Sequence, residues 1–175
     1  MAFVFAYTLD GDSTGVVKDF PLDTAANYNV TAGAGTNGVT KGDLVFQVAG
    51  LLRRNGTATG AGIGVLEGQE FTGLVAAGQP YAAVNSSFTA SAIDATRYPN
   101  GVGKVRNDKS STVFKVPVFQ TGAVVTATNA HIGGSYCLGI TAAGDQQVDL
   151  NTTTTPAVKV IDRSDDGKFV FVQLV

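Results

Sequence analysis

The chain has 175 residues, a formal net charge of −2 at neutral pH and a charged fraction of only 15%. Its 22 Gly residues contrast with one His, one Cys and no Trp, so it is rich in turn-forming residues and poor in the side chains that serve as bases, nucleophiles and metal ligands. This balance argues against an enzyme, a metal or a cofactor, and the weak negative charge argues against nucleic-acid binding. One Cys excludes an internal disulfide.

The N-terminal segment alternates the aromatic residues Phe3, Phe5 and Tyr7 with smaller ones. Two interpretations of this segment remain open, because the aromatic residues can belong to a strand of the core or be exposed and contact a partner. The segment lacks the basic region and the apolar length of a secretory signal. No stretch of the chain reaches the roughly 18 apolar residues of a membrane span. We therefore expect a soluble protein made in the cytoplasm.

The next predicted element is a hairpin of residues 43–49, continued through Leu51 and Leu52, with residues 63–66. Its connection, residues 54–62, is rich in Gly and predicts a loop. Arg53 and Arg54 fall at the start of this loop, where they either project into solvent or contact an acidic partner or a phosphate. The glycines of the loop lack the GxGxxG spacing of a dinucleotide-binding turn.

The middle of the chain offers one candidate helix, a short turn or two at residues 87–97. Residues 98–111 are polar and predict an exposed loop or arm that carries Lys104, Arg106 and Lys109. Three cations are too few for a nucleic-acid groove.

The C-terminal part contains the clearest strand signals. Residues 157–161 and 168–175 are rich in β-forming residues and flank a turn with an Asp-Gly pair, which predicts a hairpin. Residues 112–119 predict a strand that Pro117 makes an edge or bulged one. Residues 123–128 predict another strand.

These elements predict a mainly β, antiparallel fold in barrel or sandwich form, with at most one or two short helices. Residues 1–175 suit a single domain. A division into sub-lobes 1–80 and 112–175, joined by an extended segment 81–111, is compatible with the same pattern.

His131 and Cys137 are the one pair that suggests nucleophilic catalysis, as base and thiol of a small hydrolase. The surrounding sequence misses the GxSxG nucleophile elbow by its last residue. A lone His near a lone Cys is more often structural, and we expect neither to be catalytic.

Several segments resemble the capsid decoration (cement) proteins of tailed bacteriophages. These are Lys41-Gly-Asp-Leu-Val45 followed by Ile63-Gly-Val-Leu-Glu-Gly68, then residues 132–138, 147–153 and 158–162 with the closing hairpin. The likeness covers about half of the chain, and no catalytic residue comes with it. It implies a β-rich structural virion protein, commonly a homotrimer, that binds the major capsid protein on the outside of the assembled viral capsid.

For such a protein we expect the partner contacts to come from the N-terminal segment and from the two basic loops. The expected contact residues are Phe3, Phe5, Tyr7, Arg53, Arg54, Lys104, Arg106 and Lys109. The alternative function is a carbohydrate- or receptor-binding module of a phage tail or adhesin, in which Tyr81 or Tyr98 would contact sugars. The absence of Trp counts against this alternative.

Overall fold

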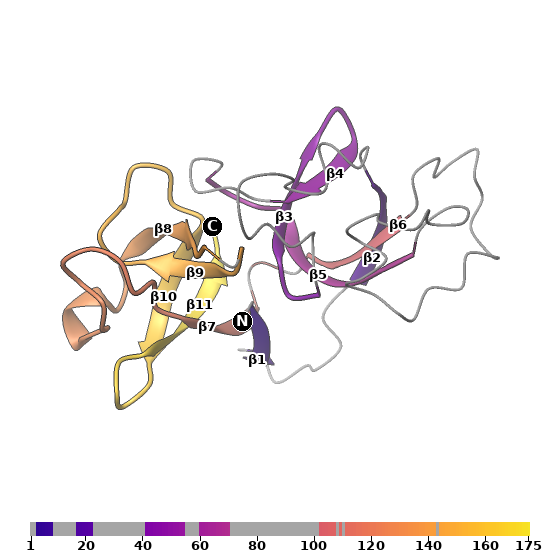
Figure 1. Cartoon of the computed structure of the whole chain (residues 1–175). Helices are drawn as coiled ribbons and strands as arrows, with labels where there is room; N and C mark the ends of the chain where they lie inside the picture. Colours follow the sequence, from indigo (N-terminus) through magenta and orange to yellow (C-terminus); the bar gives the residue numbers. More distant parts are fainter. Residues whose placement is uncertain are drawn as a thin grey trace.

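The computed structural model describes residues 3–8, 17–22, 41–54, 60–70, 102–107, 109, 111–142 and 144–175. These residues form two antiparallel sheets, and one short 3-10 turn at Asn129–His131 is the only helical element among them (Figure 1). The mainly β, antiparallel prediction is therefore confirmed. Both sheets curl, but neither closes into a barrel. The helix predicted at residues 87–97 lies outside the described residues.

The larger sheet has six strands in the order β1-β7-β11-β10-β8-β9. They are β1 (Val4–Thr8), β7 (Thr112–Pro117), β8 (Ser135–Ile140), β9 (Gln146–Asp149), β10 (Val158–Arg163) and β11 (Phe169–Leu174). The predicted C-terminal hairpin is confirmed as β10 and β11, and strict alternation along β11 buries Val170, Val172 and Leu174. The predicted strand at 112–119 is confirmed as β7.

Strand β7 lies inside the sheet and is not an edge strand, because β1 and β11 flank it. Pro117 is tolerated because it is the last residue of β7 and pairs only with Phe169 of β11. The pairing with β1 ends at Lys115. The N–H that Pro117 lacks is therefore not needed on that side.

The smaller sheet has five strands in the order β2-β6-β5-β3-β4. They are β2 (Val17–Pro21), β3 (Leu44–Val48), β4 (Leu51–Arg54), β5 (Gly64–Glu70) and β6 (Val102–Arg106). The sheet curls until Leu22, just after β2, forms a single bridge with Leu52 of β4. Gly103 permits this curl, since a Cβ there would lie 2.5 Å from Leu52 Cδ2.

Strand β6 corrects the prediction of a polar arm at residues 98–111. It lies inside the five-stranded sheet, between β2 and β5, and buries Val102 and Val105. Lys104 and Arg106 flank Val105 and face the other side of the strand from it, so the basic residues that suggest a loop are the half-buried positions of a strand.

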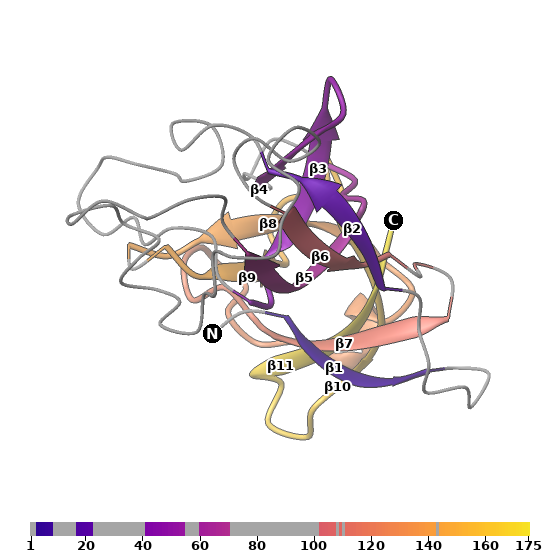
Figure 2. The ribbon, with the colours of Figure 1, turned by 90° about the vertical axis from the view of Figure 1, so that its right-hand side faces the viewer.

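The strands also divide differently from the predicted sub-lobes 1–80 and 112–175. The N-terminal strand β1 joins the sheet that the C-terminal residues form, while β6, from the expected connecting segment, joins the other sheet. Burial of Phe3 accompanies this arrangement: Phe3 is 3% exposed, and its ring lies edge-on to that of Phe114, with ring centroids 6.1 Å apart. Figure 1 shows the two sheets side by side, and Figures 1 and 2 both show β1 below the smaller sheet.

The predicted pairing of residues 43–49 with residues 63–66 is confirmed, since Leu44 of β3 is opposite Val65 of β5, but the connection is arranged differently from the prediction. Residues 51 and 52 do not continue the first strand, because β3 turns at Ala49 and Gly50 and returns as β4. Both turn residues have positive φ, 50° for Ala49 and 82° for Gly50, as a two-residue type I′ turn requires. Sequence reasoning missed this turn because Ala is unusual in the left-handed region.

Replacing Ala49 with Asn should stabilise the protein by about 0.5–1 kcal/mol, because Asn tolerates positive φ and Asn-Gly is the favoured pair for this turn. The matched change Gly50→Ala should destabilise it by about 1 kcal/mol or more through backbone strain alone, since a Cβ at Gly50 would meet nothing within 4 Å. Urea unfolding measures both. Equal stability of the two variants would contradict the turn assignment.

The strand predicted at residues 123–128 does not form. Its backbone is held instead by side chains: Val124 N donates to Asn151 Oδ1 at 2.8 Å, and Asn151 Nδ2 donates to Val124 O at 3.1 Å. Gln120 Nε2 donates to Val125 O at 3.0 Å. These amides replace the neighbouring strand that the β-forming residues would otherwise need.

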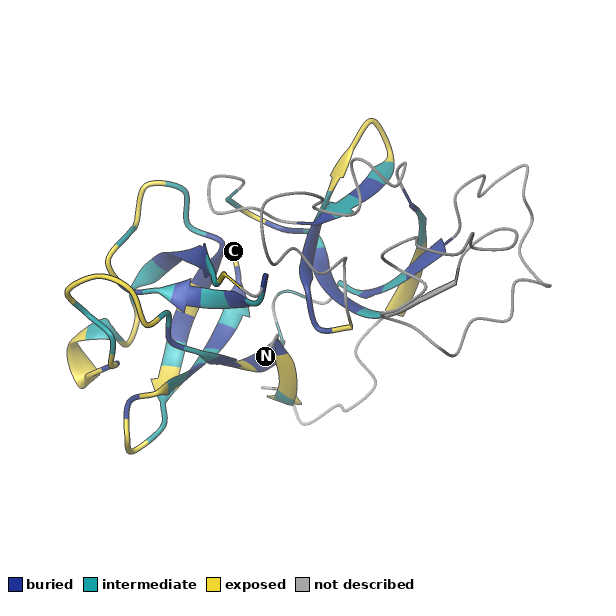
Figure 3. Cartoon of the chain, in the orientation of Figure 1, coloured by how far each residue is buried: buried dark blue, intermediate teal, exposed yellow. Residues whose placement is uncertain are grey.

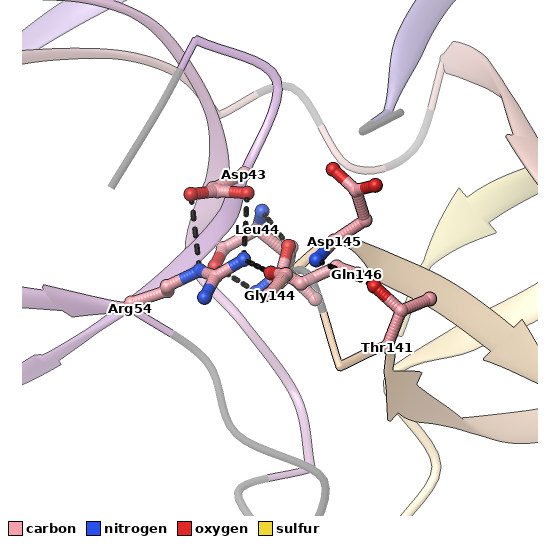
Figure 4. Close-up of polar contacts among 7 residues, drawn as sticks. All are labelled: Asp43, Leu44, Arg54, Thr141, Gly144, Asp145 and Gln146. Carbon is pink, nitrogen blue, oxygen red and sulfur yellow. Dashed lines mark hydrogen bonds and ion pairs between the residues drawn. The ribbon is translucent and has the colours of Figure 1, made fainter. Parts of the chain in front are cut away.

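The two sheets are joined through the side chain of Gln146, which is fully buried (Figure 4). Its Oε1 accepts a hydrogen bond from Leu44 N at 2.6 Å, and its Nε2 donates to Leu44 O at 3.0 Å. The amide of β9 thus satisfies both backbone groups of a β3 residue, as a neighbouring strand would do.

A buried ion pair lies beside this contact. Arg54 of β4 and Asp43 have side chains only 3% and 1% exposed, with Nε 3.0 Å from Asp43 Oδ2. Arg54 Nη2 also donates to the carbonyl of Gly144, in the turn that leads into β9. That turn is held by Thr141, whose Oγ1 accepts from Asp145 N at 3.0 Å. The ion pair therefore also connects the two sheets (Figure 4).

Replacing Gln146 with Leu should destabilise the protein by about 2–4 kcal/mol, because two buried backbone groups of Leu44 lose their partner. The matched control is Gln147→Leu on the same strand. The buried Gln147 Oε1 has no hydrogen-bond partner among the described residues, so its loss should change stability by less than about 0.5 kcal/mol. Equal losses in thermal or urea unfolding would show that the Gln146 contact does not join the sheets.

Candidate partner-binding surface

Strand β1 lies at the edge of the six-stranded sheet, with β7 as its one neighbour among the described strands. Its apolar side chains are unusually exposed: Val4 is 52% exposed, Phe5 38% and Tyr7 40% (Figure 3). Only Phe3, just before the strand, is core. The core interpretation therefore applies to Phe3, whereas Phe5 and Tyr7 are exposed.

Phe5 and Tyr7 project from opposite faces of the sheet. The register of β1 against β7 shifts between them, so that Phe5 is opposite Phe114, a core residue, while Tyr7 is opposite Val113. Because facing residues of antiparallel strands share a side of the sheet, Phe5 lies on the side of the core and Tyr7 on the outer side. Tyr7 stands beside Phe171, with ring centroids 6.3 Å apart.

Charged side chains of the other sheet meet Phe5. The guanidinium carbon of Arg106 lies 4.9 Å from the centroid of the Phe5 ring, a cation–π contact. Arg106 Nε is 2.7 Å from Glu67 Oε1, and Lys41 Nζ is 3.8 Å from Glu67 Oε2. Glu67, Arg106 and the exposed Lys41 therefore form a chain of ion pairs that ends at the ring of Phe5.

A cavity of about 280 Å³ opens between β1 and β5 at this place. We call its lining residues the β1 edge surface: Phe3, Val4, Phe5, Lys41, Gly42, Val65, Leu66 and Glu67. The surface combines apolar walls with one exposed cation and a partly buried acid. Such a combination suits a protein partner that inserts an apolar side chain.

The other expected contact residues lie apart from this surface. Arg54 is buried in the joint between the sheets and is not at a solvated hairpin tip, because the hairpin turns at Ala49 and Gly50. Arg53 is half-buried on β4 and Lys104 half-buried on β6. Lys109 Nζ donates to the carbonyl of Val175 at 2.9 Å. Of the eight residues, Phe3 and Phe5 line this surface, Arg106 contacts Phe5, and Tyr7 lies on strand β1 with Phe5.

Sequence reasoning missed Val4, Lys41 and Glu67. Lys41 and Glu67 do stand in the two segments that resemble decoration proteins, and Glu67 directly follows the apolar residues Val65 and Leu66. A charge directly after apolar residues is the signal that could have indicated Glu67.

His131 and Cys137 have separate structural contacts. Nδ1 of His131 accepts from Thr128 N at 2.9 Å, and the ring lies 6.0 Å from that of Tyr136. Cys137 is buried, and its Sγ accepts from Thr155 N at 3.3 Å. Each side chain thus helps to hold a loop. Within the described ranges no group of three or more His, Cys, Asp or Glu residues is placed to bind a metal ion.

A second, more open groove of about 460 Å³ lies over β8 and β9 and includes Asp149. Burial raises the pKa of Asp149, but hydrogen bonds from Asn151 and Thr152 outweigh it and lower the pKa below the usual 3.8. Its oxygens accept from Asn151 N at 2.9 Å and from Thr152 Oγ1 at 2.8 Å. The carboxylate is therefore part of the fold, because it orients the Asn151 amide that holds residues 121–124.

Replacing Asp149 with Asn should lower stability near neutral pH by weakening these hydrogen bonds. The depressed pKa means that the carboxylate stabilises the fold fully above its unfolded pKa of 3.8, and that this stabilisation is lost as pH falls through the lower folded pKa. The difference between wild type and variant should therefore shrink below pH 3.8. Urea unfolding across pH measures it, with exposed Asp165→Asn as control. A difference that is constant with pH would contradict the assignment.

Comparisons with known proteins found no match to a family model, a curated protein or a solved structure. The part of the chain that the structure describes contains no helix long and apolar enough to cross a membrane. Because these comparisons supply no function, the functional proposal below is based on the residues of the β1 edge surface.

Proposed function

We propose that the chain is a structural virion protein that binds the outer surface of an assembled phage capsid through the β1 edge surface and stabilises the shell. One observation carries the proposal: Val4 and Phe5 stand exposed on an edge strand, beside a cavity with apolar walls. Exposed apolar residues that line a cavity and are rimmed by charge are typical of protein-binding sites. The resemblance to decoration proteins supplies the partner, the major capsid protein.

The physical role follows from mass action. A protein that binds the assembled shell and not the free subunit stabilises the shell by a free energy that grows with the logarithm of its affinity. An edge strand offers backbone groups as well as side chains to a partner. With only 15% charged residues, the chain makes such contacts mainly through apolar area and backbone hydrogen bonds, and not through ion pairs or nucleic acid.

The proposal includes assembly on the capsid exterior after synthesis in the host cytoplasm. The resemblance adds a homotrimer at three-fold positions, since closed symmetry suits a lattice with matching axes. It includes no catalysis and no cofactor.

The carbohydrate- or receptor-binding alternative receives no support from the described tyrosines. Tyr136 is buried in the core, at 9% exposure. The exposed Tyr7 ring is tilted by 38° against the Phe171 ring, so Tyr7 and Phe171 do not form a flat platform. Tyr81 and Tyr98 lie outside the described residues. We therefore keep capsid binding as the proposed function.

Replacing Phe5 with Ser should weaken binding to expanded capsids of the encoding phage by about tenfold or more, because it removes an aromatic anchor from the cavity wall. Co-sedimentation of purified protein with capsids measures the affinity. Ile132→Ser, an equally exposed apolar residue at 42% in the loop before β8, should bind as wild type does. Circular dichroism establishes that both variants are folded. Unchanged binding of folded Phe5→Ser would remove the β1 edge surface from the interface.

A further inference from the structure

The outer face of the six-stranded sheet carries a row of residues that alternates in chemical character. Val4 is opposite Lys115, Lys115 is opposite Phe171, and Phe171 is opposite Asp162. Opposite residues of antiparallel strands lie on one side of a sheet, and the neighbouring Val172 faces the core. The row therefore reads apolar, positive, aromatic, negative across β1, β7, β11 and β10.

The four residues of this row are exposed or half-buried, although Val113, on the same face of β7, is fully buried. Lys115 and Asp162 are exposed, while Phe169 and Phe171 are half-buried along β11. Lys115 Nζ lies 4.5 Å from the centroid of the Phe169 ring, and Tyr7 stands beside Phe171. An aromatic strip on β11 is thus bordered by a cation on one side and an anion on the other.

The charges stand symmetrically about that strip. Neighbouring strands are about 4.8 Å apart, so Lys115 and Asp162 lie at similar distances on either side of Phe171. A two-fold axis parallel to β11 and just above the sheet exchanges these two sides. It would bring Lys115 of each copy over Asp162 of the other copy, and Phe171 over Phe171.

We propose that two copies of the chain associate face to face through this row, with β11 over β11. The charge pattern favours a second copy, because the same row supplies both partners of two ion pairs and an aromatic contact between them. A partner surface of a single charge sign would meet one like charge in the row. A two-fold contact of this kind is self-complementary and closes after two copies, so it is a separate contact from the three-fold one in the proposed function.

The row shares Val4 with the β1 edge surface, but Lys115, Phe171 and Asp162, on which the dimer contact depends, lie outside that surface, and Phe5 projects to the opposite side of the sheet. The dimer can therefore be measured on the purified protein without capsids. A failure of either proposal leaves the test of the other intact.

Sedimentation equilibrium over a concentration series tests the dimer through a charge exchange. Lys115→Glu and Asp162→Lys should each raise the dimer Kd about tenfold or more, because each places like charges together twice. The double variant, which reverses both ion pairs, should restore the wild-type affinity. Lys159→Glu is the matched control: Lys159 is an exposed cation opposite Gln173 on the same sheet, outside the row, and its reversal should change the Kd little.

Three outcomes would overturn the inference. They are a monomer at every concentration, an oligomer whose affinity the single reversals leave unchanged, and a double variant that associates no better than the single ones. Circular dichroism of each variant separates a lost contact from a lost fold, and recovery in the double variant excludes unfolding as the cause of the single effects.

Discussion

The structure depends on one buried amide. Gln146 gives Leu44 both hydrogen bonds that a neighbouring strand would give, and the Asp43–Arg54 ion pair lies beside it with a bond to Gly144. Removing either partner of such a contact leaves buried polar groups without compensation, which is far more costly than the net gain of making it. The joint therefore fixes how the two sheets meet more than it adds to their stability.

The β1 edge surface exists only because the sheets meet in this way. Phe5 comes from a strand of the six-stranded sheet, while Lys41 and Glu67 come from the five-stranded one, and the cavity lies between them. Arg106 connects the two through its contacts with Glu67 and Phe5. The joint adjoins this surface, since Asp43 follows the lining residue Gly42 and its carbonyl accepts a hydrogen bond from Leu66 N at 2.8 Å. A change at the joint would thus alter the surface.

The sequence predicts those parts of the fold that local patterns encode. The Asp-Gly turn and the alternating valines indicated β10 and β11, and the exposed aromatic residues indicated β1 as a candidate contact. The prediction failed at the turn between β3 and β4, because Ala49 is an unusual residue for the conformation that this turn requires. It also failed at β6, because the basic residues of this strand suggest an exposed loop. The joint left no local signal at all, because Gln146 and Leu44 are 102 positions apart.

The pairing of β1 with β7 has a kinetic consequence. Strand β1 can pair with β7 only after all strands of the five-stranded sheet, β2 to β6, have been synthesised, because they lie between β1 and β7 in the chain. Contacts so distant along the chain carry a high loop-closure cost and slow the search for the native state. Until β1 docks, β7 presents an open edge to other chains, so nascent molecules are most vulnerable to misassembly in the interval before the sheet is completed.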